Sequence, residues 1–270
     1  MRSLVQAAFL ATLMASSIAS AYQVEVGGMI EKTKIDNVDG DADTFALTGK
    51  YYLAPVKNDA SPLAEAAFLS KTGHLGLNFA RVDGDGGSLD VVGISGEYYI
   101  PDSQFYVSAG ISRTSADGAE DGDGYSAEFG VMPSQNLLLA AGITDMSESA
   151  DAAFSVKKGF VTSLGAGLAA GEDSAPTLRG KYVTTLGSNQ VNLEGQFIFG
   201  DETGYMFGGD LYLDKTLSIG ASIADSTADN SETIFNLRAQ KFLTPAVAVG
   251  VAYVSADEIS SYGLNLTGRF

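Results

Sequence analysis

A period of two between apolar and polar side chains is the feature that most constrains this sequence. Over residues 262–270, Tyr262, Leu264, Leu266 and Phe270 share one parity, and polar or small residues occupy the other. This is the pattern of a β-strand with one apolar and one polar face. A chain end is ordinarily polar and frayed unless a sheet holds it, so the pattern predicts that this strand pairs with another.

The best partner for that strand is the first alternating stretch, residues 22–34. Tyr22, Val24, Val26 and Ile30 again share one parity, with polar side chains or glycine between most of them. Pairing of the first strand with the last closes a sheet on itself and leaves no edge. We therefore expect a closed barrel.

Alternation continues through the chain and predicts an all-β fold. No apolar run after residue 21 is long enough for a membrane helix, so a membrane-spanning chain of this kind must form closed β-structure. We expect a transmembrane antiparallel up-and-down β-barrel of fourteen strands, or of sixteen if residues 146–175 form an extra hairpin. The strands are expected at 22–34, 44–53, 72–83, 88–100, 104–115, 124–132, 136–145, 176–186, 189–200, 204–213, 216–225, 232–243, 246–255 and 260–270.

The first 21 residues have the pattern of an export signal. Arg2 is followed by a short apolar core at 5–14 and by Ala19-Ser20-Ala21, an A-x-A cleavage site. The core is shorter than the ~18 residues that a membrane helix needs. The predicted organisation is a signal peptide at 1–21 and one barrel at 22–270.

Composition excludes several classes of protein. The net charge of −17 argues against a nucleic-acid partner, and the absence of cysteine excludes disulfides and thiolate metal sites. The acidic segment 39–43 lacks the glycine and glutamate of a calcium loop, although weak bridging of divalent ions stays open. We expect no cofactor and no bound metal.

The connections between strands divide into short turns and longer acidic loops. The short ones lie near 101–103, 133–136, 214–215 and 244–245, and the long ones at 35–43, 116–123, 146–175 and 224–231. Strict alternation of the two kinds is expected for an outer-membrane barrel with short periplasmic turns. The exception is 54–70, a long connection on the short-turn side, whose apolar sequence SPLAEAAFL predicts a turn of helix.

Charged side chains inside the strands fall on the polar parity. A charged side chain facing lipid at the membrane midplane costs ~2–4 kcal/mol for Arg or Lys, so these residues are expected in the lumen. They are either structural ion pairs or solute contacts, and a barrel of fourteen strands is nearer in size to water-filled than to side-chain-filled barrels. The candidate pore-lining residues are Glu25, Lys50, Glu97, Glu128, Arg179, Lys181, Glu194, Asp210, Arg238 and Arg269.

Aromatic residues on the apolar parity predict two girdles at the membrane interfaces. His74, the only histidine, falls on the lumen parity. A barrel hydrolase would need a serine within hydrogen-bond reach of it and a third group to orient it, so we assign no catalytic residue. The girdle residues are Tyr51, Tyr98, Phe105 and Phe270 at the short-turn end, and Phe199, Phe207, Phe235 and Tyr262 at the long-loop end.

Three segments carry a family resemblance: YYLAPV with SPLAEAAFL at 51–69, GEYYIP at 96–101 and FLTPAVAVG at 242–250. They resemble the bacterial outer-membrane "putative porin" family. The resemblance implies a 14-stranded barrel of a Gram-negative outer membrane, among lipid and lipopolysaccharide, that passes water and small hydrophilic solutes without catalytic residues. The last strand of this chain resembles the signal that the barrel-assembly machinery recognises, with Tyr262, Leu264, Leu266 and Phe270 on its apolar face.

The sequence therefore predicts a passive channel in the outer membrane. Acidic loop residues such as Asp117 and Glu120 predict mild cation preference, because charge at a mouth concentrates counter-ions. The cluster of Arg179, Lys181 and Arg238 would oppose it if it lined the narrowest point. The alternatives are a barrel that is not a channel, either adhesin-like or lipid-hydrolysing, and a soluble β-sandwich.

Overall fold

The computed structural model describes residues 21–35, 40–57, 62–118, 120–146, 174–229 and 231–270. Residues 1–20 of the expected signal peptide and most of the stretch 146–175 lie outside this part. None of the helices in the described ranges is long and apolar enough to cross a membrane.

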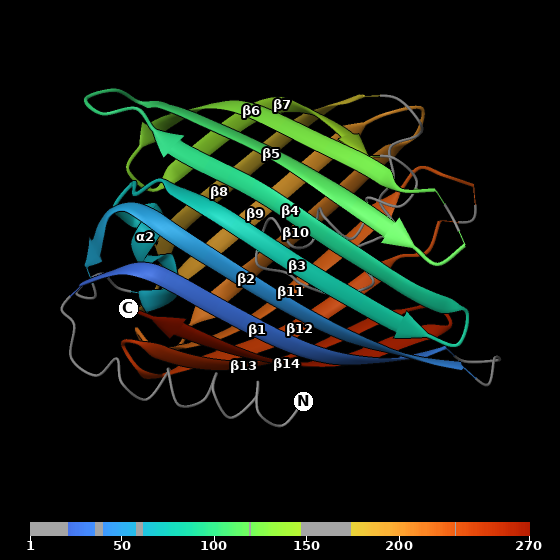
Figure 1. The fold of residues 1–270 in the computed structure, drawn as a ribbon. Coiled ribbons are helices and arrows are strands. Elements are labelled where there is room, and N and C mark those ends of the chain that lie inside the picture. Colours follow the sequence, from blue (N-terminus) through green and yellow to red (C-terminus); the bar gives the residue numbers. More distant parts are fainter. Residues whose placement is uncertain (1–20, 36–39, 58–61, 119, 147–173, 230) are drawn as a thin grey trace.

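Fourteen antiparallel strands form one closed barrel in which every strand pairs with its neighbours in sequence (Figure 1). The predicted fold is confirmed, with fourteen strands and not sixteen in the wall, because β7 pairs directly with β8. The strands are β1 (Ala21–Ile35), β2 (Gly40–Lys57), β3 (His74–Gly84), β4 (Gly87–Tyr99), β5 (Phe105–Ala116), β6 (Gly122–Ser134), β7 (Leu137–Met146), β8 (Ala175–Leu186), β9 (Asn189–Phe199), β10 (Thr203–Tyr212), β11 (Leu217–Ser226), β12 (Ile234–Thr244), β13 (Val247–Ala256) and β14 (Ile259–Arg269).

The first and last strands close the barrel as their shared pattern predicts. β1 and β14 pair from Glu25 opposite Arg269 to Ile35 opposite Ile259. Phe270 extends the pairing, since its carbonyl oxygen accepts from the backbone N–H groups of residues 23 and 24, and its own N–H donates to the Val24 carbonyl at 2.9 Å. The barrel therefore has no free strand edge at this seam.

Alternation separates an apolar outer wall from a polar lumen. Leucine and isoleucine side chains such as Leu75, Ile111 and Leu237 are more than half exposed on the outside. Seven of the expected girdle aromatics are exposed, and Phe270 is half-buried. Exposed apolar area of this kind is stable only against lipid or another apolar surface.

The expected strict alternation of short and long connections is wrong. Three connections on the long-loop side are tight: residues 85–86, 200–202 and 257–258. At the first, Asp85-Gly86 is a typical two-residue hairpin turn, followed by Gly87 at φ +133°.

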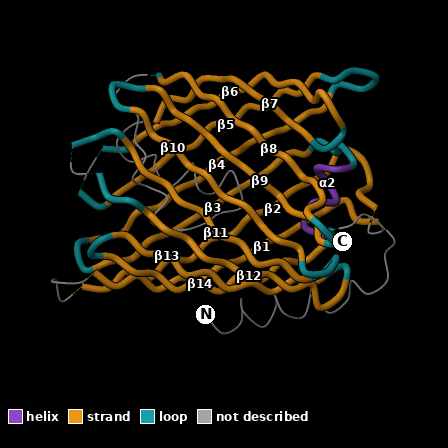
Figure 2. Tube along the Cα trace, turned by 180° about the vertical axis from the view of Figure 1, so that it is seen from behind, coloured by secondary structure: helices purple, strands orange, loops and turns teal. Residues whose placement is uncertain are grey.

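The connection after β2 folds back into the barrel. As predicted, it contains a helical turn, formed by the 3-10 turn η1 (Leu63–Glu65) and the short helix α2 (Ala66–Leu69). β2 itself runs on to Lys57, four residues beyond the expected end. Both views place the helix within the ring of strands near the end that carries the C-terminus (Figures 1 and 2).

Candidate pore and the segment inside it

The ten charged residues expected in the lumen all face interior cavities. Each of these side chains points inward because it lies on the polar face of its strand. Glu128 lines the upper lumen; Glu97 and Arg179 line a cavity of about 170 Å³; Asp210 and Arg238 line one of about 340 Å³; and Glu25, Lys50, Lys181, Glu194 and Arg269 line both of the latter.

The basic side chains in the lumen are held in ion pairs. Their partners come from neighbouring strands or from strands one step further, so the pairs brace the wall. Burial makes such pairs costly to break, because removing one partner leaves the other charge buried and unpaired. The closest N–O distances are Arg269–Glu25 2.8 Å, Arg179–Glu128 2.9 Å, Lys181–Glu194 2.8 Å, Arg238–Asp210 2.8 Å and Lys50–Glu25 3.6 Å.

One of these pairs depends on a glycine. Arg238 on β12 reaches Asp210 on β10 across the intervening strand, where Gly220 pairs with both residues. A Cβ at position 220 would overlap the Asp210 carboxylate and lie 2.8 Å from the Arg238 Nε. Gly220 therefore leaves the space through which the two side chains meet.

Residues 63–69, which we call the inner segment, cross the lumen at the short-turn end. Leu63 packs against Phe242 on one wall, and Phe68 against Tyr106 on another. Ala66 packs against a third group, on β1 and β2, which includes Tyr22 and Tyr52. These contacts reach strands on well-separated parts of the barrel, so the segment occupies this end of the lumen.

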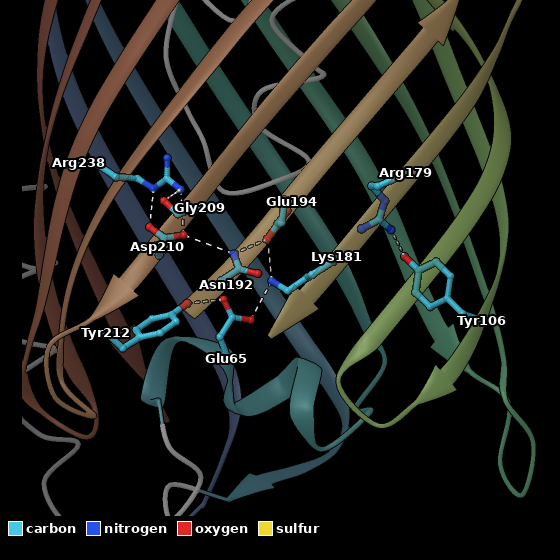
Figure 3. Close-up of polar contacts among 10 residues, drawn as sticks. All are labelled: Glu65, Tyr106, Arg179, Lys181, Asn192, Glu194, Gly209, Asp210, Tyr212 and Arg238. Carbon is cyan, nitrogen blue, oxygen red and sulfur yellow. Dashed lines mark hydrogen bonds and ion pairs between the residues drawn. The ribbon is translucent and has the colours of Figure 1, made fainter. Parts of the chain in front are cut away.

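Glu65 anchors the inner segment to the wall (Figure 3). Its carboxylate accepts a 2.7 Å hydrogen bond from the Tyr212 hydroxyl and lies 2.8 Å from the Lys181 ammonium. The neighbouring Leu63 is tied through its backbone: its carbonyl accepts from Arg269 at 3.0 Å and its N–H donates to the Lys215 carbonyl at 2.9 Å. The single carboxylate of the segment is thus bound from two strands.

Comparison with known proteins agrees with this architecture. The profile of the family described as "Putative general bacterial porin" matches residues 1–270. The chain belongs to this family. The porin is also similar to the crystal structure of the Acinetobacter baumannii outer membrane protein Omp33, with 29% identity, a TM-score of 0.72, and coverage of 94% of this chain and 100% of that one.

More distant structures share the fold alone with this porin. A bacterial polysaccharide outer membrane secretin is 9% identical, with a TM-score of 0.51 and coverage of 92% of this chain and 99% of that one. No curated protein sequence is significantly similar to the porin.

Two acidic residues of the lumen were missed by the sequence analysis. Glu31 is 4% exposed and shares the parity of Glu25, and Glu65 is 6% exposed in the inner segment. Parity could have found Glu31, and a carboxylate in the otherwise apolar SPLAEAAFL was the signal for Glu65. With these two, the inward carboxylates named here number seven, against the five basic residues named above.

His74 lies on the inner wall of the porin, where it lines the smaller cavity. Its Nδ1 is 3.9 Å from the Glu97 carboxylate, and its ring centroid is 5.7 Å from that of Tyr52. Two residues of the expected assembly signal lie on the outer wall: Tyr262 and Leu264 are more than half exposed there.

Proposed function

We propose that this outer-membrane porin is a passive channel for water, ions and small hydrophilic solutes. The observation that carries the proposal is the combination of an apolar outer wall with a charged inner wall that encloses cavities of about 340 and 170 Å³. In a dry barrel filled by side chains, these charges would lose their contact with water. That desolvation costs free energy, and contact of the outer wall with lipid does not compensate for it.

The inner segment lies across the path that a conducted solute would take. The segment contacts β1, β2, β5, β6, β7, β8, β12 and β13 through its three apolar side chains and their neighbours. A solute that crosses the membrane must pass the level at which these contacts lie. The structure therefore supports a channel whose conductance depends on the position of residues 63–69.

The charge distribution favours cations. The loop residues Asp117, Glu120 and Asp121 lie outside the strands at the long-loop end, where their field extends ~8–10 Å at physiological salt. Arg179 and Lys181, which would oppose them, are each bound to a carboxylate at 2.9 Å or less. Ion pairing cancels most of the electrostatic field of these two basic residues, so the acidic loop residues at the mouth determine that cations are preferred over anions.

Planar bilayers test both parts of this proposal. The mature chain, with the inner segment released by substitution of Glu65, is expected to conduct and to show a zero-current potential of the cation-selective sign across a KCl gradient. That potential is expected to shrink as ionic strength rises, because salt screens the mouth. Anion selectivity at both low and high salt would show that the basic lumen residues decide instead.

A barrel that does not conduct is the second candidate, and the inner segment is the observation in its favour. A lumen crossed by a packed segment suits a structural or adhesive protein as well as a closed channel. The two differ in one outcome: a structural barrel stays silent in bilayers even when Glu65 is replaced and the protein is inserted and folded.

A further inference from the structure

The connection that leaves the inner segment contains a strained residue. Of the described residues other than glycine, only Lys71 and Asp102 have a positive φ, at +51° and +54°. The left-handed region is unfavourable for most residues with a Cβ, and Asn and Asp tolerate it best because their short polar side chains hydrogen-bond locally. Lysine has no such side chain, so more strain is expected at Lys71 than at Asp102.

Two backbone hydrogen bonds at the end of α2 hold Lys71 in this conformation. The Thr72 N–H donates to the Ala67 carbonyl oxygen, and the Lys71 N–H donates to the Phe68 carbonyl oxygen, both at 2.9 Å. This pair of bonds forms a Schellman motif, in which the left-handed position is most often glycine. The strain at Lys71 therefore exists as long as α2 and its last turn keep the form that they have in the lumen.

The side chain of Lys71 gives no reason for lysine at this position. It is half-buried, and it forms no hydrogen bond or ion pair with any residue that the structure describes. Strained residues persist only where the surrounding structure holds them, and they are concentrated at ligand sites and switch regions. The backbone conformation is thus the property of Lys71 that needs a function.

The chain beyond Lys71 is fixed to the barrel wall. The Gly73 carbonyl oxygen accepts from the Leu53 N–H at 2.9 Å, and a Cβ at position 73 would overlap the Glu97 carbonyl oxygen. Displacement of the inner segment therefore changes the backbone between α2 and Gly73. Such hinges consist of a few residues that absorb the change in φ and ψ.

We propose that Lys71 is a strained hinge that favours release of the inner segment from the lumen. A helix as short as α2 depends on its packing, so a displaced segment loses the turn that holds Lys71 left-handed. Relief of this strain opposes the contacts of Glu65 with Lys181 and Tyr212, which hold the segment in place. The inference rests on the proposed channel function and adds the residue that adjusts the balance between its closed and open forms.

A series of substitutions at position 71 separates backbone strain from side-chain effects. Glycine removes the strain, asparagine reduces it, alanine keeps it without the charge, and β-branched valine increases it. Lys71→Gly is expected to lower the population of the displaced segment about fivefold, although glycine also gains freedom in the displaced form, and Lys71→Val is expected to raise it about fivefold. Lys71→Asn is expected to lie between Lys71→Gly and wild type, and Lys71→Ala to match wild type.

Labelling of a single cysteine measures this population. The chain has no cysteine, and Ala66 is 0% exposed where it packs against Tyr22 and Tyr52. In the full chain carrying Ala66→Cys, folded in detergent, a water-soluble thiol reagent reaches the sulfur only after the segment is displaced. With labelling slow relative to reclosure, the rate follows the displaced population. Open probability in planar bilayers, recorded without the added cysteine, reports the same balance independently.

Asp102→Gly is the matched control. Asp102 is the other left-handed residue and lies in the turn between β4 and β5, outside the inner segment and its connections. Its replacement by glycine is expected to leave the labelling rate and the open probability unchanged. Folding of every variant is checked by the shift in gel mobility on heating.

Three results would overturn the inference: equal labelling of Lys71→Gly and wild type, no labelling in any folded variant, or labelling of Lys71→Ala as slow as that of Lys71→Gly. The last result would assign the effect to the lysine side chain. Absence of current in every variant would refute the channel function instead, and the labelling series would then decide the hinge by itself.

Discussion

Replacing Glu65 by glutamine is expected to release the inner segment. Glutamine keeps the shape of the side chain and an acceptor for Tyr212, but removes the charge that faces Lys181 at 2.8 Å. Breaking a buried ion pair costs 3–5 kcal/mol where the remaining charge is left alone. Lys181 retains Glu194 at 2.8 Å, so the cost is nearer that of one charged hydrogen bond, about 2 kcal/mol.

A loss of about 2 kcal/mol from the closed arrangement raises the ratio of open to closed channels about 30-fold. Single-channel recording in planar bilayers measures this ratio directly as open probability. Asp210→Asn is the matched control: it also removes a lumen carboxylate from a 2.8 Å ion pair, but its partner Arg238 belongs to the wall and not to the segment.

The reasoning about Glu65 is refuted in two ways. Open probability of Glu65→Gln could equal that of the wild type although the protein is folded and inserted. Alternatively, Asp210→Asn could open the channel as much as Glu65→Gln does, in which case loss of any lumen carboxylate, and not release of the segment, would be the cause.

Three further predictions concern the wall and its turns. Gly220→Ala is expected to lower the free energy of unfolding by about 1–3 kcal/mol, because the added Cβ displaces the Arg238–Asp210 pair. Gly49→Ala is the control and is expected to change this free energy little, since nothing lies within 4 Å of the added Cβ. Equal urea midpoints for the two variants would contradict the prediction. Deletion of Phe270 removes the backbone bonds to residues 23 and 24 and is expected to reduce the heat-modifiable fraction in the outer membrane, while wild-type levels would show that the seam closes without it. Hydrogen bonds from Thr216 and Leu217 lower the pKa of Asp214 to about 2 from 3.8. The carboxylate therefore contributes to stability above pH ~4, and this contribution is lost as the pH falls through ~2. The melting temperatures of Asp214→Asn and wild type are expected to converge near pH ~2, and a difference that stays constant with pH would exclude this role.

The sequence predicted the wall well, because each strand carries its own evidence. A period of two places Glu25 or Arg238 in the lumen from local pattern alone, and the matching patterns of the first and last strands predicted their pairing. Strand ends were placed less well: β2 runs four residues past the expected end, since pairing with β1 continues to Lys57 opposite Ala21.

The inner segment shows what local pattern leaves undetermined. Its helical turn follows from its own residues, but its position depends on Leu63 and Phe68 finding apolar surfaces on strands far away in the sequence. The residues of SPLAEAAFL do not indicate whether the connection folds into the barrel or away from it. Glu65 was the one local signal, because a carboxylate between apolar residues needs a polar partner when it is buried.

The inner segment is joined to the barrel at both of its ends, through residues 58–62 to β2 and through residues 70–73 to β3. A displaced inner segment stays tethered close to its binding position in the lumen, so its effective concentration at that position is in the millimolar range or above. Reclosure is then a unimolecular event whose rate is independent of how much protein the membrane holds. A free peptide with the same sequence would have to reach millimolar concentration to block an open barrel as well as the tethered segment does.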